Sequence, residues 1–174
     1  MSTEKETFEV VYEKHFSNIY NFIYGQILHR ERAEDLVSDI FIKAMTHYET
    51  FDPSRASVRT WLTNIARNAL IDEYRKSGIR MHQSLDDEET NFTEPSYEDE
   101  YQVFKDEEKK AVYHLLSLLS PSERELAGMI YFQNMKNGEI AEVLGINAKA
   151  VSERHRRLLA KCRQLAEKAG LTDM

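Results

Sequence analysis

The sequence predicts an all-α protein of two small helical domains joined by a flexible acidic linker, with a helix-turn-helix in the second domain. Its 174 residues include only 6 Gly and 3 Pro, fewer than a turn-rich β fold needs. Apolar residues recur at helical spacing in several separate segments. Charge is uneven: residues 1–78 carry net −2, residues 79–107 net −8 and residues 108–174 net +3. These three ranges are the predicted N-terminal domain, linker and C-terminal domain.

The acidic middle range is predicted as a linker because it has almost no periodic apolar face. Such a segment cannot bury enough apolar surface to offset the entropy of ordering it. The alternative, a long surface loop within one domain, is less favoured because structureless loops beyond about 15 residues are uncommon there. The net charge of −7 taken alone argues against nucleic acid, but the linker supplies more than all of it.

Composition also bounds the location of the chain. No apolar run approaches the roughly 20 residues that a membrane span needs, so we expect no membrane insertion. The start of the chain has no signal-peptide pattern, and the single cysteine, Cys162, excludes an intramolecular disulfide framework. Both observations favour a cytoplasmic protein.

Three amphipathic helices are expected in residues 1–78. The first has apolar residues at helical spacing from Phe8 to Ile27, and the second from Ala33 to Tyr48, with residues 25–30 as a tight connection between them. The third is predicted to begin after Asp52 and Pro53, which suit a helix cap and a first turn, and to end at residues 77–78.

The third helix has a polar face that suits either solvent or DNA. Its members are long basic donors and carboxamides, types that contact phosphates and base edges. They are Arg59, Thr63, Asn64, Arg67, Asn68 and Arg75.

In residues 108–174, a helix from about residue 107 to 119 is followed by a capping box at Ser120 and Glu123, with Pro121 in the first helical position. The next helix is predicted to reach about Gln133 and to bury apolar side chains. These are Leu126, Ile130 and Tyr131.

A helix-turn-helix is predicted after this helix. Ala141 is small enough for two helices to approach, Gly145 permits the tight turn, and Val151 lies at the matching place in the next helix. The second of these helices carries seven Lys and Arg against two Glu, a charge that suits the major groove. The alternative is a basic helix that only faces solvent. Cys162 lies on its apolar stripe and is expected to be packed in the core.

Catalysis has little support. The six histidines are scattered, with no His-Glu-x-x-His or Cys-x-x-Cys pair. The glycines are isolated, so no phosphate-binding loop is present. We therefore expect no enzyme, no metal site and no cofactor.

The segments AEDLVSDIFIKAM (33–45), TFDPSRASVRTWLTNIARNALIDEYRK (50–76) and LSPSERELAGMIYFQNMKNGEIAEVLGINAKAVSERHRR (119–157) together resemble an extracytoplasmic-function (ECF) sigma factor. The resemblance implies that the first domain binds core RNA polymerase and recognises and melts the −10 promoter element. It implies that the second domain reads the −35 element. Promoter DNA and core polymerase are thus the expected partners, and anti-sigma factors, common in the family, are a further candidate.

The resemblance also implies three sets of contact residues. The polymerase-binding set is Glu34, Asp35, Ser38, Asp39 and Lys43. The −10 set is Ser54, Arg55, Arg59, Asn64 and Asn68. The −35 set is Lys149, Ser152, Glu153, Arg156 and Arg157.

The presumed recognition helix departs from the family. Where the family commonly has Val-Lys-Ser-Arg-Leu, residues 151–155 read Val-Ser-Glu-Arg-His, so the −35 sequence cannot be inferred from relatives. Glu153 could accept from a cytosine amino group or pair with Arg157. Two other functions compete with a sigma factor: a free-standing helix-turn-helix regulator acting as a homodimer, and a helical adaptor whose basic helix is incidental.

Overall fold

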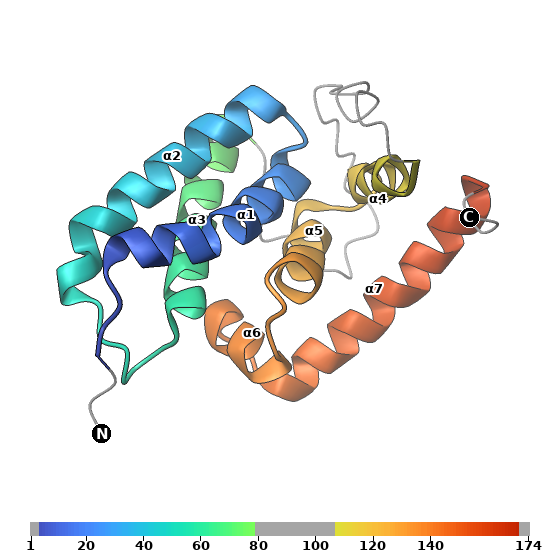
Figure 1. Cartoon of the computed structure of the whole chain (residues 1–174). Coiled ribbons are helices and arrows are strands. Elements are labelled where there is room, and N and C mark those ends of the chain that lie inside the picture. Colours follow the sequence, from blue (N-terminus) through green and yellow to red (C-terminus); the bar gives the residue numbers. More distant parts are fainter. Residues whose placement is uncertain (1–3, 79–106, 171–174) are drawn as a thin grey trace.

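The computed structural model describes residues 4–78 and 107–170, and in these ranges all regular structure is helical (Figure 1). The all-α prediction is confirmed. The predicted linker lies almost wholly outside the described residues. The helices form two groups, an N-terminal bundle in residues 4–78 and a C-terminal group in residues 107–170.

The N-terminal bundle packs three long helices around one core. Helix α1 (Phe8–Ile27) and helix α2 (Arg30–His47) are joined by only two residues, because Leu28 takes a left-handed conformation (φ 57°) and ends α1. The predicted connection over residues 25–30 is therefore too long, and its first three residues are helical. A short 3₁₀ turn η1 (Tyr48–Thr50) follows α2.

Helix α3 (Val58–Lys76) begins later than predicted. The hydroxyl of Ser57 accepts from the backbone N–H of Thr60 at 3.1 Å and caps the helix. Asp52, the predicted cap, instead accepts from the backbone N–H and the hydroxyl of Ser54, at 2.9 and 2.7 Å. This closes a turn of the kind that Asp side chains favour. The predicted end at residues 77–78 is confirmed.

The C-terminal group begins with α4 (Glu107–Ser117) and α5 (Pro121–Ala127), which continues into a π-helical segment η3 (Gly128–Phe132). The predicted capping box is confirmed: Ser120 Oγ accepts from Glu123 N–H at 3.3 Å, and Ser120 N–H donates to Glu123 Oε1 at 3.2 Å. Tyr131, predicted as buried, is 54% exposed, and its hydroxyl lies 3.1 Å from Nε2 of His155.

Helix α6 (Asn137–Leu144) and helix α7 (Ala148–Lys168) complete the molecule. Helix α7 lies along one edge, α6 lies beside the N-terminal end of α3, and the C-terminal half of α1 lies between α2 and α3 on one side and α4 and α5 on the other (Figure 1). The two groups share one continuous apolar core. In the described part of the chain, no helix is both long and apolar enough to cross a membrane.

Candidate nucleic-acid interface

The predicted polymerase-binding residues share the outer face of α2. The inner face of this helix, which includes Val37, Ile40 and Ala44, is buried against α1 and α3. Because an α-helix turns by 100° per residue, the polar residues between these positions face outward. All five members of the set are exposed, and the structure brings them together as one surface, called here the α2 surface: Glu34, Asp35, Ser38, Asp39 and Lys43.

An apolar groove of about 350 Å³ lies beside the α2 surface, between α1 and α2. Glu34 and Ser38 line it together with aromatic residues of α1. Ile42 and Met45 of α2 also line it and are 56% and 57% exposed. Exposed apolar side chains grouped beside charges are typical of a protein-binding surface. Our sequence reasoning missed the groove, although Ile42 and Met45 interrupt the polar face of α2 at a spacing of one turn.

The predicted −10 residues are divided by the fold. Ser54 and Arg55 lie in the turn before α3, where the hydrogen bonds from Ser54 hold the pKa of Asp52 below its usual value. Arg55 points its Nε toward that carboxylate at 3.7 Å. Asn64 and Asn68, one helical turn apart on α3, are exposed. These four polar side chains are available to an extended ligand.

Arg59, the fifth predicted −10 residue, faces the C-terminal group. It is half-buried, and its Nη1 donates to the backbone carbonyl of Asn134 at 3.3 Å. Two neighbours on the predicted polar face are also turned away from solvent: Thr63 is buried and donates to the carbonyl of Arg59 at 2.7 Å, and Arg67 pairs with Glu125. The predicted polar face of α3 is therefore only partly exposed, because residues of the C-terminal group contact Arg59 and Arg67.

The helix-turn-helix has the predicted geometry. Gly145 has φ 68°, a left-handed conformation that a side chain would strain, and the N–H of Ile146 returns to the carbonyl of Ala141 at 3.1 Å. Asn147 caps α7 by accepting from Ala150 N–H at 2.8 Å. Ala141 and Val151 are buried between the two helices, as predicted.

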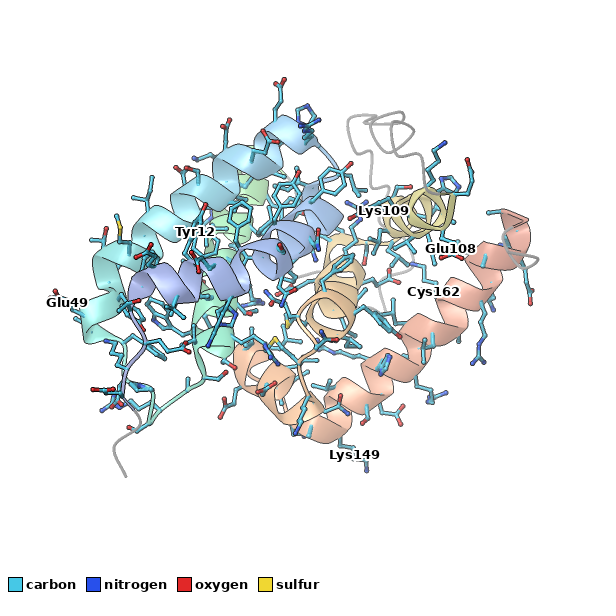
Figure 2. The ribbon with its side chains drawn as sticks, in the orientation of Figure 1. Tyr12, Glu49, Glu108, Lys109, Lys149 and Cys162 are labelled. Atoms are coloured by element: carbon cyan, nitrogen blue, oxygen red, sulfur yellow. The ribbon has the colours of Figure 1, made fainter. Side chains whose placement is uncertain are left out.

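The predicted −35 residues occupy the N-terminal half of α7 and are all exposed: Lys149, Ser152, Glu153, Arg156 and Arg157. Lys149 projects outward at the start of the helix, away from the other elements (Figure 2). Ser152 Oγ accepts from Asn137 Nδ2 at 3.0 Å, which ties this face to α6. Glu153 pairs with Arg156 at 3.0 Å on the exposed side. The face combines cations with polar groups that can donate to and accept from base edges.

The rest of α7 anchors this face. Leu158 is buried, and Lys161 Nζ donates to the nearly buried carboxylate of Glu123 at 2.6 Å, which joins α7 to the start of α5. Cys162 is half-buried on the packed side, and burial raises the pKa of its thiol. A thiol kept protonated in this way is a packing group, consistent with its predicted place. Across residues 4–78 and 107–170, no cluster of three His, Cys, Asp or Glu could hold a metal ion.

Two family models match the chain. The model described as Sigma-70 region 2 matches residues 11–79, and the model described as Sigma-70, region 4 matches residues 109–162. The first match contains the α2 surface and the predicted −10 residues. The second contains the helix-turn-helix and the exposed face of α7.

Several curated relatives of this chain are described as ECF RNA polymerase sigma factors. The chain is 28% identical to the ECF RNA polymerase sigma factor BldN of Streptomyces coelicolor, over 85% of this chain and 56% of BldN. It is 35% identical to the ECF RNA polymerase sigma factor SigX of Bacillus subtilis, over 41% of this chain and 37% of SigX. The chain thus spans only 56% of the length of BldN and 37% of the length of SigX. It is 28% identical to SigM of B. subtilis over 88% of this chain and 93% of SigM.

Two solved structures have a similar fold. CnrH, in complex with the cytosolic domain of CnrY, superposes with a TM-score of 0.68 at 24% identity, over 92% of this chain and 88% of CnrH. The sigma factor RpoE from Bartonella quintana, in complex with the anti-sigma factor NepR, superposes with a TM-score of 0.66 at 21% identity. That match covers 92% of this chain and 96% of RpoE.

Proposed function

This chain belongs to the extracytoplasmic-function (ECF) sigma factors, and from that membership we propose that it binds core bacterial RNA polymerase and directs transcription initiation from specific promoters. One observation carries the proposal. A region 2 match and a region 4 match occur on one chain in that order, and each contains an exposed surface of the required chemistry, on α2 and on α7.

The α2 surface is the proposed contact with core polymerase. Its carboxylates suit a basic partner, and the adjacent groove with Ile42 and Met45 offers apolar area that such a contact would bury. Asp39 and Lys43, one turn apart on α2, give this surface both signs of charge. Mixed charge around an apolar patch orients a partner and excludes wrong ones.

The two DNA surfaces would divide the promoter between them. Asn64 and Asn68, with the turn that carries Ser54 and Arg55, would contact the −10 element, where capture of an unpaired base offsets an unstacking cost of a few kcal/mol. The exposed face of α7 would enter the major groove of the −35 element, as a recognition helix does. The proposed domains are residues 1–78 and 108–174, with residues 79–107 as the acidic linker between them.

The proposed role needs no catalysis by the chain itself. Chemistry would belong to the polymerase, so the chain is proposed to be a non-enzymatic specificity factor that works in the cytoplasm. RpoE of B. quintana was solved with an anti-sigma factor, which supports an inhibitor of that class as a third partner for this chain. A homodimeric regulator is less well supported, because the region 2 match gives the N-terminal bundle a role that a dimeric repressor would not use.

Association with core polymerase tests the proposal. The purified chain should co-elute with bacterial core polymerase, and Asp39→Arg, which places a cation in the α2 surface, should weaken that association at least tenfold without altering the circular dichroism of the free chain. Glu49→Arg is the matched control, since Glu49 is an exposed acid in η1, outside the α2 surface (Figure 2). Equal binding by wild type and Asp39→Arg would remove the α2 surface from the proposal. A wild-type chain that does not co-elute at all would contradict the function.

A further inference from the structure

The segment before α1 is tied to the connection between α2 and α3, and Lys5 makes the central contact. Residues 4–7 run beside this connection, which covers residues 48–57 (Figure 1). The ammonium group of Lys5 donates to the backbone carbonyls of Tyr48 at 2.5 Å and of Glu49 at 3.3 Å, across 43 residues of sequence in the first case. Both carbonyls directly follow α2, and a helix C-terminus carries partial negative charge. Lys5 therefore caps the end of α2 from a distant part of the chain.

The same ammonium group lies over two aromatic rings. Its Nζ is 4.4 Å from the ring centroid of Tyr48 and 5.7 Å from that of Phe51. Both side chains are nearly buried, at 9% and 7% exposure. The face of an aromatic ring attracts a cation within about 6 Å of its centroid. Lys5 thus holds two backbone carbonyls and two rings in place at once.

Neighbouring residues fix the path of this segment. The hydroxyl of Tyr48 donates to the backbone carbonyl of Glu6, and the carboxylate of Glu6 pairs with Lys14 of α1. The side chain of Thr7 caps the start of α1. The first residues of a domain are ordered when such contacts tie them down. Residues 4–7 are called here the N-terminal strap.

The rings beneath Lys5 extend the contact to the start of α3. The ring centroid of Phe51 lies 6.0 Å from that of Tyr48 and 4.8 Å from that of Trp61, in the first turn of α3. The rings of Tyr48 and Trp61 are 5.9 Å apart. Tilted ring pairs at these distances attract each other beyond the effect of burial. The strap, the end of α2 and the start of α3 therefore meet in one aromatic cluster.

The turn over residues 52–55, called here the −10 turn, directly follows Phe51. Its Asp52 carboxylate accepts from the backbone N–H and the hydroxyl of Ser54, at 2.9 and 2.7 Å. These hydrogen bonds are the main cause that lowers the pKa of Asp52, and the charges of Arg55 and Lys5 act in the same direction. The charge of Lys5 therefore acts on the turn as well as on the rings beside it.

The hydrogen bonds that close the −10 turn are local. Asp52 accepts from Ser54, two residues away, and its carbonyl accepts from the N–H of Arg55 at 3.1 Å. Bonds of this kind fix the shape of a turn but not its direction relative to the helices around it. The direction is set at the two ends, by the Ser57 cap of α3 on one side and by the strap and the rings on the other.

We propose that Lys5 is a positioning residue for the −10 element, which orients the −10 turn so that Ser54 and Arg55 meet an unpaired base in the geometry that its capture requires. The inference rests on the proposed function for the role of the turn, but the ordering of the turn by Lys5 does not depend on that function. Capture has to offset the cost of unstacking the base, and a contact that is ordered beforehand loses less entropy on binding. Loss of Lys5 should therefore impair promoter opening and leave polymerase binding unchanged.

Fluorescence of Trp61 tests the ordering in the free full-length chain. Trp61 is the single tryptophan and contacts Phe51, so its surroundings report on the segment that Lys5 holds. Lys5→Met keeps an apolar stem without the charge, and acrylamide should quench its Trp61 fluorescence roughly twofold more strongly than that of the wild type. Lys5→Arg keeps a cationic donor and should return the quenching to near the wild-type value. Lys168→Met, at an exposed position in the last turn of α7, removes the same charge and should leave quenching unchanged.

Transcription separates positioning from a general structural role. The template is a promoter recovered by mapping transcript 5′ ends with the wild-type chain, either fully paired or mismatched across its −10 block. With core polymerase, Lys5→Met should give about tenfold less transcript from the paired template, the order of one lost charged contact. The loss should be much smaller on the mismatched template, which needs no melting. Lys5→Arg should restore transcription, and co-elution of Lys5→Met with core polymerase should equal that of the wild type.

Three results would overturn the inference. Equal acrylamide quenching in the wild type and Lys5→Met would show that Lys5 does not order the turn. Equal losses of transcript on the two templates, or weaker co-elution of Lys5→Met with core polymerase, would show a general structural role in place of positioning. Failure of the proposed function would look different: the wild type would neither co-elute with core polymerase nor give start sites of its own, while the change in Trp61 quenching persisted.

Discussion

The two predicted DNA-binding surfaces carry similar residue types but have different surroundings. On α7, the predicted −35 residues are all exposed, and the buried residues Val151 and Leu158 lie on the packed side of the helix. On α3, Asn64 and Asn68 are exposed, while Arg59 contacts the C-terminal group and Arg67 pairs with Glu125. One surface is exposed to solvent, and the other is partly occupied by contacts within the protein itself.

This difference shows that exposure of a DNA-binding residue can be set by domain arrangement as well as by helix periodicity. Helix α7 lies at the edge of the molecule, whereas α3 lies between its own bundle and α6 (Figure 1). The guanidinium groups of α3 therefore have an internal alternative to DNA, and those of α7 that face solvent meet mainly their own helix, as Arg156 does with Glu153.

Removing Arg124 should have the largest effect, because its fully buried guanidinium joins the two groups of helices: it donates to the carbonyls of Leu116 and Ser117 at the end of α4 and of Gln26 near the end of α1. Arg124→Met keeps the length of the stem but deprives these three main-chain carbonyls of a charged donor, and we expect a loss of about 3 kcal/mol in the free energy of unfolding. Urea denaturation measures it. Arg163→Met, at an exposed position of α7, is the control and should change stability by less than about 0.5 kcal/mol. A loss for Arg124→Met no greater than the loss for the control would show that these hydrogen bonds contribute nothing to stability.

Arg156→Ala should weaken DNA binding by the exposed face of α7. If Arg156 reads a base, the change should weaken binding to −35 duplex DNA by about 1–3 kcal/mol and leave binding to random duplex less affected. Electrophoretic mobility shift assays with the −35 duplex and with the random duplex measure these two losses of affinity separately. An equal loss on random DNA would reassign Arg156 to a phosphate. Arg163→Ala, two turns further along α7, provides the comparison within the same helix.

Arg59→Ala should affect DNA binding by the α3 surface only where the contact between Arg59 and Asn134 is broken. In the wild type the side chain is engaged with Asn134, so its loss should change affinity for single-stranded DNA little. A methyl added at Gly128 would lie 2.6 Å from the ring of Phe22 of α1 and should loosen the packing between the two groups of helices. In a Gly128→Ala background, Arg59→Ala should therefore cost about 1 kcal/mol more in DNA binding. A double-mutant cycle by fluorescence anisotropy gives the coupling directly, and zero coupling would contradict competition between Asn134 and DNA for Arg59.

The smallest expected effect is a pH dependence of stability through Glu125. Burial raises the pKa of this carboxyl above its ordinary 4.5, and the charges of Arg67 and Arg154 oppose the shift only in part. The folded chain therefore holds the Glu125 proton to higher pH than the unfolded chain does. The contribution of Glu125 to stability should increase as pH falls from 7 toward the ordinary pKa, and should be lost as pH rises through the raised value. Urea denaturation at pH 7 and pH 5 measures this contribution, and Glu125→Gln should abolish it. If the measured pH dependence of the wild type equals that of Glu125→Gln, Glu125 is excluded as the titrating group.

Sequence reasoning succeeded where the deciding contacts are local. The capping box at Ser120 and Glu123 spans three residues, and the turn at Gly145 depends on its own φ. It was also correct for the outward faces of α2 and α7, since a helix with one packed side exposes the other. The start of α3 was misplaced because Asp52 can either cap a helix or close a turn, and only the neighbouring hydrogen bonds to Ser54 decide between these roles.

Sequence reasoning failed where contacts join residues that lie far apart in the sequence. Arg124 and its acceptor Gln26 are 98 residues apart, and nothing near either residue indicates the other. A helical polar face likewise does not reveal that Arg67 will meet Glu125 or that Gly25 will meet Phe132. These pairings arise from the packing of the two groups, which periodicity within one helix cannot report.

Mapping of transcript 5′ ends tests the central claim most directly. Core bacterial polymerase and this chain would transcribe total genomic DNA, with core polymerase alone as the reference. We expect a set of start sites that appear only with the chain and share two short sequence blocks upstream, near −10 and −35. Start sites identical to those of core polymerase alone would contradict it.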